Sequence, residues 1–390
     1  MTSNHKSVGV TAAGGFRAAG VTAGLKASGT PDLALVVNDG PMHAAAGVFT
    51  SNRVKAAPVL WSQQVLKAGE LAAVVLNSGG ANACTGAGGF QDTHATAEKV
   101  AAELGVGAGE VAVVSTGLIG VRLPMDVLLP GVEQAAKALS ADGGEAAAIA
   151  IKTTDTVHKT AQLSRSGWTV GGMAKGAGML APGLATMLVV VTTDAVVDST
   201  GLDEALRAAT RTTFDRVDSD GCMSTNDTVL LLASGASEVT PDAAEFNAAV
   251  QQVCAELARQ LIGDAEGASK DIEIVVTGAA TEDEAVDVAR VIARNNLLKC
   301  ALHGEDPNWG RVLAAIGTTS AAFDPDRLDV AINGVWVCRN GSVGDDRDLV
   351  DMTGREITIT ANLNAGEAEA TVWTNDLTAD YVHENSAYST

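Results

Sequence analysis

Residues 171–194, GGMAKGAGMLAPGLATMLVVVTTD, decide how the chain is organised. Their first half is rich in glycine and holds one lysine, Lys175, which predicts a loop. After Ala185 and Thr186 the stretch continues into the apolar run 187–191, which has the length and composition of a buried strand. A hydroxyl at Thr186 is therefore expected where a rigid element begins. On these residues alone, the favoured interpretation is that Thr186 is an ordinary edge residue of the strand.

The bulk composition indicates a globular protein and argues against two classes of partner. The chain has 390 residues, 46% of them hydrophobic, which suffices for a core in two domains or in one bilobed domain. Its formal net charge is -21. Because a strongly acidic surface repels phosphates and anionic lipid headgroups, we expect no nucleic-acid partner and no membrane partner.

The N-terminal residues and the cysteines bear on the location and on bound groups. MTSNHKSVGVTAAGG contains neither a basic leader followed by an apolar core nor an Arg- and Ser-rich amphipathic helix, so we expect a cytoplasmic protein. The five cysteines form no CxxC pair and the six histidines have no HExxH spacing. We therefore expect no metal and no cofactor.

Hydrophobic periodicity predicts helices and strands in an irregular order. Strands are expected over residues 32–38, 46–49, 57–61, 71–76, 110–115, 161–170, 187–191, 228–233, 272–277, 328–332, 357–361 and 369–373. Helices are expected over residues 90–104, 125–139, 145–151, 202–212, 243–262 and 282–295. This order favours an α+β layered fold over a doubly wound parallel sheet. Asp-rich turns near Ala279 indicate a second lobe from about residue 280.

Without a metal or a favourable histidine, an N-terminal threonine is one way to obtain a nucleophile. If the bond before Thr186 were cut, the new α-amine, with a pKa of about 7.7 to 8.0 in peptides, could act as general base for its own hydroxyl. The chain could cut itself, because the Thr186 hydroxyl can attack the carbonyl of Ala185 to give an ester that water then opens. The glycines and Pro182 before this bond suit the strained turn that the attack requires.

The run KGAGMLAPGLATML closely resembles the self-processing segment of the ornithine acetyltransferase family, also called glutamate N-acetyltransferase. Six further family-like blocks accompany it in the family's order: VVSTGLIG (113–120), TTDT (153–156), STNDTV (224–229), DAEGASK (264–270), DPNWGR (306–311) and the terminal ENSAYST. Seven ordered blocks are far more specific than any one of them. The chain departs from the family's pattern at Lys152, where an apolar residue is expected, and at His158, where proline is common.

The resemblance implies a role for several residues. It makes Thr186 the nucleophile, and the Thr116 hydroxyl with the Gly117 amide the oxyanion hole. It implies substrate contacts at Thr153, Lys175, Thr186, Glu266, Asn385 and Thr390. Because TTDT offers two adjacent threonines, the first contact could instead be Thr154. From the residues alone, Lys175 would be interpreted as a solvated loop charge and Glu266 as an exposed carboxylate at a helix end.

The implied fold is a layered α/β/β/α-type domain, like that of N-terminal nucleophile enzymes, with a smaller C-terminal lobe. The implied processing gives an α chain, residues 1–185, and a β chain, residues 186–390, two of each forming a heterotetramer. The implied activity is ping-pong acetyl transfer from N-acetyl-L-ornithine to L-glutamate through an acyl-threonine, in arginine biosynthesis. Some members of the family also accept acetyl-CoA, and no nucleotide motif in the chain decides this.

Two alternative functions remain open from the residues. A self-processing threonine amidase or aminopeptidase would pass the acyl group to water, so it would release acetate without glutamate. An amino-acid-binding protein without activity would stay uncut and would bind without turnover.

The tail NSAYST carries no charged side chain, so the only anion that it can bring to a pocket is the carboxylate of Thr390. We expect the tail to fold over the substrate. Asn385 would then hydrogen-bond the substrate, and the tail would keep water from the acetyl ester.

We predict cleavage between Ala185 and Thr186. Mass spectrometry of the purified protein should find a fragment that begins Thr-Met-Leu-Val, because only this bond precedes the proposed nucleophile. Thr186→Ala removes the attacking hydroxyl and should leave the chain intact. Cleavage that persists in this variant would contradict the mechanism.

Overall fold

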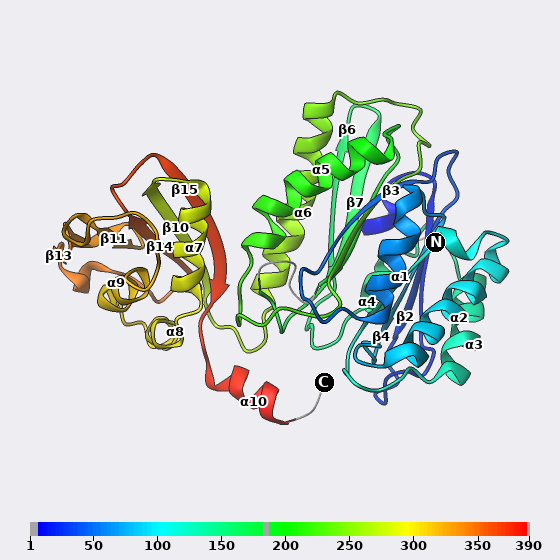
Figure 1. The fold of residues 1–390 in the computed structure, drawn as a ribbon, viewed down its shortest axis with the longest axis horizontal. Coiled ribbons are helices and arrows are strands. Elements are labelled where there is room, and N and C mark those ends of the chain that lie inside the picture. Colours follow the sequence, from blue (N-terminus) through cyan, green and yellow to red (C-terminus); the bar gives the residue numbers. More distant parts are fainter. Residues whose placement is uncertain (1–6, 182–186, 388–390) are drawn as a thin grey trace, which may run out of the picture.

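The computed structural model describes residues 7–181 and 187–387, which form two lobes joined through the segments before β10 and after β15 (Figure 1). Ala185, Thr186 and Thr390, which carry predicted roles, lie outside the described residues. Of the helices within the described ranges, none is long and apolar enough to cross a membrane.

The larger lobe contains two β-sheets that face each other. The first sheet has four strands in the order β1-β2-β4-β5: β1 (Phe16–Val21), β2 (Leu33–Asn38), β4 (Ala73–Ser78) and β5 (Val111–Thr116). The second has five strands in the order β3-β9-β8-β7-β6: β3 (Ala44–Phe49), β9 (Thr228–Ala233), β8 (Leu188–Thr193), β7 (Trp168–Lys175) and β6 (Lys159–Arg165).

Runs of apolar residues form these strands because both faces of each sheet are covered. In β8, Val190 points into the core between the sheets, while Val189 and Val191 belong to the core under the outer helices. In β2, Val36 faces the second sheet and Leu35 faces helices on the other side. A strand that is buried on both faces loses the polar alternation of a surface strand. This is why β2, β4, β5, β8 and β9 are buried along their whole length.

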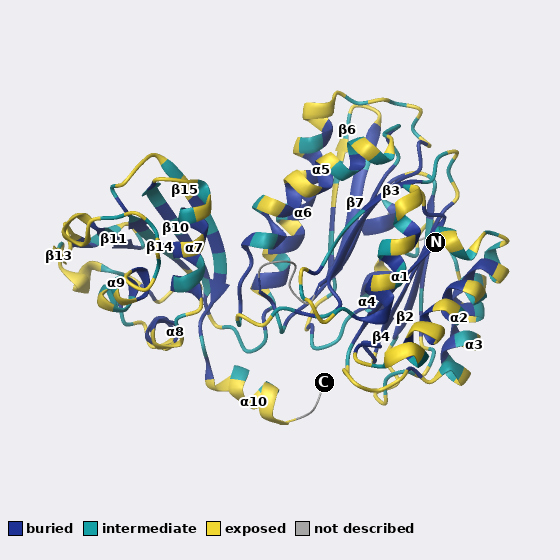
Figure 2. Cartoon of the chain, viewed as in Figure 1, coloured by how far each residue is buried: buried dark blue, intermediate teal, exposed yellow. Residues whose placement is uncertain are grey.

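Helices complete a four-layer arrangement around the two sheets. Helices α2 (Gly86–Leu104) and α3 (Met125–Lys137) cover the outer face of the first sheet, and α5 (Ser199–Thr212) and α6 (Ala243–Gly263) cover that of the second. Two shorter helices, α1 (Ala57–Val65) and α4 (Gly144–Ala150), pack against the first sheet. Figure 2 shows the buried strands between helices that are exposed on one side. The predicted α+β class with α/β/β/α layers is confirmed.

The smaller lobe has a core of its own, built on a six-stranded sheet. Its strands, in the order β13-β12-β11-β14-β10-β15, are β13 (Ser342–Val343), β12 (Val335–Arg339), β11 (Asp329–Ile332), β14 (Glu356–Asn362), β10 (Asp271–Ala279) and β15 (Ala368–Asn375). Three helices pack with it: α7 (Glu282–Ala293), α8 (Asn296–His303) and α9 (Trp309–Ile316). After β15 the last element of the described residues is α10 (Ala379–Ala387).

Three predicted elements are wrong. The expected strand 57–61 is the start of α1, because Pro58 lies in the first helical turn, where its missing amide hydrogen is not needed. The expected strand 161–170 is a hairpin, β6 and β7, which turns at Gly167 with φ of +92°. The glycine-rich loop was expected to begin at Gly171, but this residue lies inside β7. Glycine is required there because a Cβ atom would lie 2.0 Å from the backbone oxygen of Gly9.

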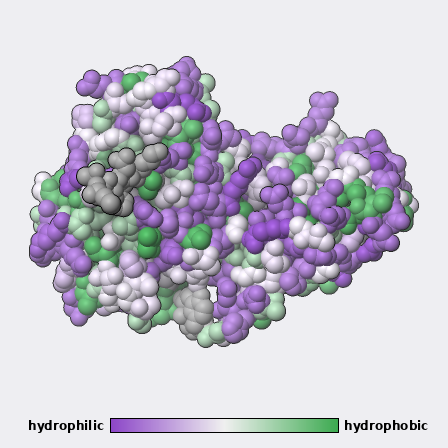
Figure 3. Space-filling model, turned by 180° about the vertical axis from the view of Figure 1, so that it is seen from behind, coloured by the Kyte–Doolittle hydropathy of each residue, from purple (hydrophilic) through white to green (hydrophobic). Residues whose placement is uncertain are grey.

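The surface on one side of the molecule is largely polar. The face seen in Figure 3 is mostly hydrophilic, and its hydrophobic side chains lie in separate patches. Several charged side chains are nevertheless buried, among them Asp155, Lys159 and Lys175.

Candidate active site

A pocket of about 120 Å³ lies where β5 and β7 end, beside the start of β8. Its lining comes from segments far apart in the sequence, which are Ala81, Thr116, Gly117, Ile119, Thr153, Thr154, Lys175, Gly178, Met179, Ser224, Thr225, Asn226, Glu266 and Asn385. Every described residue for which the sequence predicts a catalytic or substrate role is among them. A pocket of this volume suits a small molecule and not a polymer.

Thr116 and Gly117 form the end of β5 at the pocket. Gly117 has φ of +126°, and a Cβ atom there would lie 2.6 Å from the amide nitrogen of Gly80, so only glycine fits. The Gly117 amide donates no hydrogen bond to any described residue. The Thr116 hydroxyl and a free backbone amide thus lie next to each other, as an oxyanion site requires.

Lys175 is the last residue of β7 and is only 2% exposed. Its Nζ donates a hydrogen bond to Thr116 Oγ1 at 3.3 Å, so the hydroxyl proton of Thr116 is directed away from the ammonium. Burial lowers the pKa of Lys175, and the negative charge of Asp155 opposes this effect. The interpretation of Lys175 as a solvated loop charge is therefore wrong.

A buried ion cluster lies beneath the pocket. Lys159, which is fully buried, donates to Asp155 Oδ1 and to Asp264 Oδ2, at 2.6 Å in both cases. Asp155 also accepts the amides of Gly176 at 2.6 Å and Thr153 at 3.0 Å. Burial alone would raise the pKa of Asp155, but Lys175 and Lys159 outweigh it and hold this pKa at about 2.

Residues 153–156, called the threonine loop below, and Glu266 both contribute to the pocket beside this cluster. Thr153 and Thr154 both line the pocket, so the choice between them stays open. Glu266 follows Asp264 by two residues, and its carboxylate accepts a hydrogen bond from Asn385 Nδ2 at 2.8 Å. It forms no ion pair with any described residue. The pocket therefore contains a carboxylate that is available to a cationic substrate.

A sequence model of the ArgJ family matches residues 17–390. The Arginine biosynthesis bifunctional protein ArgJ of Streptomyces coelicolor is 77% identical over 97% of this chain and 99% of that protein, and the protein of the same name from Thermobifida fusca is 65% identical over 98% and 100%.

The chain belongs to the ArgJ family.

Solved structures of the family resemble parts of the chain. The ornithine acetyltransferase of Mycobacterium tuberculosis, complexed with ornithine, is 63% identical and covers 47% of this chain and 97% of its own, with a TM-score of 0.45. The Arginine biosynthesis bifunctional protein argJ of Bacillus halodurans is 38% identical and covers 50% and 97%, with a TM-score of 0.48.

Sequence reasoning missed several residues of this ArgJ-family pocket. Asn226 is 3% exposed, and its Nδ2 donates to the carbonyls of Ala81 at 2.6 Å and Ser115 at 2.8 Å. It therefore joins the segment before β9 to the first sheet. The block STNDTV, which contains Asn226, was the signal that could have pointed to it.

No group of three or more potential metal ligands occurs within residues 7–181 and 187–387.

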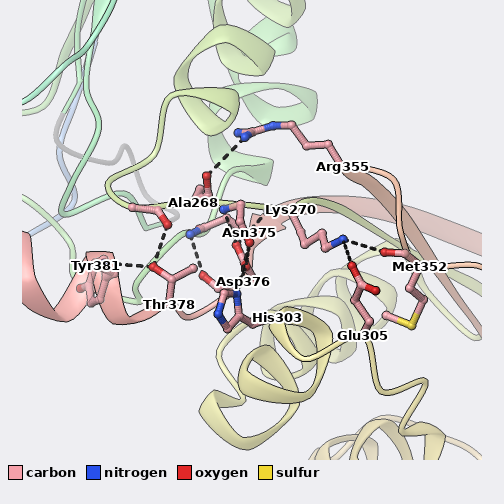
Figure 4. A network of polar contacts seen from close by, with 12 residues as sticks. Ala268, Lys270, His303, Glu305, Met352, Arg355, Asn375, Asp376, Thr378 and Tyr381 are labelled. Carbon is pink, nitrogen blue, oxygen red and sulfur yellow. Dashed lines mark hydrogen bonds and ion pairs between the residues drawn. The ribbon is translucent and has the colours of Figure 1, made fainter.

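A polar network centred on Asp376 holds the segment that leads to Asn385 (Figure 4). Asp376 is 1% exposed and accepts the amides of Ser269 at 2.9 Å and Lys270 at 3.0 Å, while His303 Nδ1 contacts it at 2.9 Å. Burial would raise the pKa of Asp376, but hydrogen bonds from Ser269 and Lys270 lower it overall.

The same network continues into α10. Thr378 Oγ1 donates to the carbonyl of Gly267 at 2.7 Å and accepts the amide of Tyr381 at 3.0 Å. Glu266 and Asn385 therefore belong to two segments that are fixed to each other.

We predict that Asp376→Ala destabilises the fold, because the amides of Ser269 and Lys270 lose their buried acceptor. Each buried donor that loses its acceptor costs about 1 to 3 kcal/mol. Urea unfolding at neutral pH should therefore show a free energy of unfolding that is lower by at least this amount. Asp380→Asn, an exposed change in α10, is the matched control and should change stability by less than about 0.5 kcal/mol.

The difference between wild type and Asp376→Ala should also depend on pH. The folded-state pKa of Asp376 is depressed, so its stabilisation is present above the unfolded pKa of about 3.9 and is lost as the pH falls through the folded-state value. Equal stabilities of the two proteins at neutral pH would show that the network does not hold the fold.

Proposed function

We propose that the protein transfers the acetyl group of N-acetyl-L-ornithine to L-glutamate through an acyl-threonine at Thr186. The observation that carries the proposal is the convergence of Thr116, Gly117, Lys175 and Glu266 in one pocket beside the start of β8. High identity to relatives named Arginine biosynthesis bifunctional protein supports the same pathway. The proposed enzyme is autoproteolytic, with chains 1–185 and 186–390.

The first half-reaction would release ornithine. The Thr186 hydroxyl attacks the acetyl carbonyl of N-acetylornithine, its proton passes through the α-amine to the leaving nitrogen, and an acetyl ester remains on Thr186. The Thr116 hydroxyl and the Gly117 amide stabilise the oxyanion, and the ammonium of Lys175 polarises the Thr116 hydroxyl at 3.3 Å. In the second half-reaction the amine of glutamate attacks the ester, which gives N-acetylglutamate and restores the hydroxyl.

Substrate recognition follows from the charges of the pocket. The Glu266 carboxylate would attract the cationic end of ornithine, because no described residue neutralises it in an ion pair. Thr153 or Thr154 would hydrogen-bond the substrate from the threonine loop. Asn385, together with Thr390, would close the tail over the pocket, and the buried Lys175 would favour the anionic groups of both substrates.

Three finer proposals accompany the main one. Because the relatives are named bifunctional, we propose that acetyl-CoA also serves as an acetyl donor to glutamate. We propose a heterotetramer of two α and two β chains, and a cytoplasmic location that fits a biosynthetic role. Transfer to water, as in an amidase or aminopeptidase, is not favoured.

Incubation of the purified protein with N-acetylornithine and glutamate should yield ornithine and N-acetylglutamate in equal amounts, measured by liquid chromatography. Thr186→Ala should yield neither, because it lacks the nucleophile. Release of acetate without N-acetylglutamate would favour the amidase, and no turnover by cleaved protein would reject acetyl transfer.

Thr116→Ala should lower kcat by about 10²- to 10³-fold with little change in KM, because the lost donor acts on the oxyanion and not on the bound substrate. Thr116→Ser retains the hydroxyl and is the matched control, so its kcat should stay near that of the wild type. If cleaved Thr116→Ala is as active as Thr116→Ser, this hydroxyl is not part of the oxyanion hole.

A further inference from the structure

Lys299 is a buried lysine of the smaller lobe that the proposed reaction does not use. It lies on α8 and is 4% exposed. Its Nζ donates one hydrogen bond to the backbone carbonyl of Ser219, in the larger lobe, and another to Thr374 Oγ1 of β15 at 3.1 Å. One side chain therefore connects the smaller lobe to the segment of the larger lobe that precedes β9.

Lys299 carries its charge at neutral pH although it is buried. Burial lowers the pKa of this ammonium to about 8, and the negative charges of Asp218, Asp220 and Asp376 oppose the effect. Because a buried charge is unfavourable without partners, the two hydrogen bonds determine where the ammonium can lie. The contact with the carbonyl in the larger lobe is charge-assisted, and it is therefore stronger than a contact between neutral groups.

Residues 218–222, called the anchor loop below, receive further contacts from the smaller lobe. Asp218 has no exposed surface, and its Oδ2 accepts a hydrogen bond from Arg294 Nε at 2.7 Å. The amide of Asp218 donates to the carbonyl of Trp373 at 2.9 Å. Together with the lysine contact, these bonds attach two successive residues of the anchor loop to the smaller lobe.

The anchor loop in turn holds one wall of the pocket. Asp220 Oδ2 accepts the amide of Met179 at 2.6 Å. The amide of Ser219 donates to the carbonyl of Leu180 at 2.6 Å. Met179 has φ of +56°, which is unfavourable for a residue with a side chain, so contacts from outside its own segment are needed to keep this conformation.

This wall lies against the carboxylate that is available to the substrate. Met179 and Gly178 both line the pocket. A Cβ atom at Gly178 would lie 2.5 Å from the carboxylate oxygens of Glu266, so the wall packs closely against this group. A displacement of the wall would therefore change the space beside Glu266.

We propose that Lys299 is a positioning residue for substrate binding, which keeps the pocket wall at Met179 in place beside Glu266. The lysine fixes the carbonyl of Ser219, and the amide of the same residue and the carboxylate of Asp220 hold the wall. The inference rests on the proposed function, in which this pocket binds N-acetylornithine.

The first test measures the wall without any turnover. Hydrogen exchange, read at single residues by mass spectrometry, reports how firmly the Met179 amide is held. Lys299→Met keeps the length of the side chain but loses both hydrogen bonds, so this amide should exchange about 10-fold faster than in the wild type. Thr374→Val is the matched control, because it removes only the bond within the smaller lobe. Its Met179 amide should exchange at the wild-type rate.

The second test measures substrate binding by the cleaved enzyme. Lys299→Met should raise KM for N-acetylornithine about 10-fold and change kcat by less than about 3-fold. The reason is that Thr116 and Lys175 lie on β5 and β7, whose strand pairing does not involve the anchor loop. Thr374→Val should leave both constants at the wild-type values. A loss of stability alone would lower the amount of active enzyme and hence the apparent kcat, but not raise KM.

Arg294→Met attacks the same anchor loop without a change in the buried lysine. The side chain of Arg294 is 45% exposed, so the fold should tolerate its loss, but the contact with Asp218 disappears. The Met179 amide should then exchange faster and KM should rise, each by less than in Lys299→Met, because the lysine contact remains. If Lys299→Met does not fold, this variant decides.

The outcomes separate this inference from the function on which it rests. Unchanged exchange of the Met179 amide in Lys299→Met overturns the inference, as does faster exchange with an unchanged KM. If the cleaved wild type transfers no acetyl group from N-acetylornithine, the proposed function fails. The exchange measurement then still decides whether Lys299 holds the wall.

Discussion

The arrangement of the pocket depends on one buried interaction, the bridge of Lys159 between Asp155 and Asp264. Burying three charges is unfavourable unless each has partners, and here backbone amides complete the coordination of both carboxylates. The bridge connects the threonine loop, the end of β7 and the segment that carries Glu266. Removal of Lys159 would leave two buried carboxylates in mutual repulsion, so these segments can hold their spacing only while the lysine is present.

The same cluster sets the electrostatics of the reaction. Lys175 is buried, and burial favours its neutral form, but Asp155 supplies a fixed negative charge that opposes this tendency. The Thr116 hydroxyl accepts a hydrogen bond from Lys175 Nζ, so its own proton is free to be donated into the pocket. Local pairing therefore decides the charge of the pocket, and the Glu266 carboxylate forms no ion pair with any described residue.

Much of the fold was predictable because apolar runs indicate which segments are buried. Strands that are buried on both faces must lie between other layers, so the layered arrangement follows. The errors have local causes. Pro58 starts a helix. Gly171 indicated a loop, but it is a strand residue at which only glycine leaves room for the backbone of Gly9. The described site residues were found through ordered sequence blocks, and their roles stay predictions. Asn226 and Asp376 were missed, because their partners lie far away in the sequence. Asp376, for example, meets Ser269 across 107 positions, a pairing that neither periodicity nor spacing reports.

The fold also explains how the chain could be cut without coming apart. A cut before Thr186 would separate β7 from β8, yet these strands pair along six registered positions, from Val170 with Thr193 to Lys175 with Leu188. β8 is held on its other side by β9, and side chains of β7, β8 and β9 share the two cores on either side of the sheet. The contacts that maintain the lobe are therefore independent of the peptide bond at residue 185. Cleavage would remove a covalent link between two strands that the hydrogen bonds of the sheet already hold together.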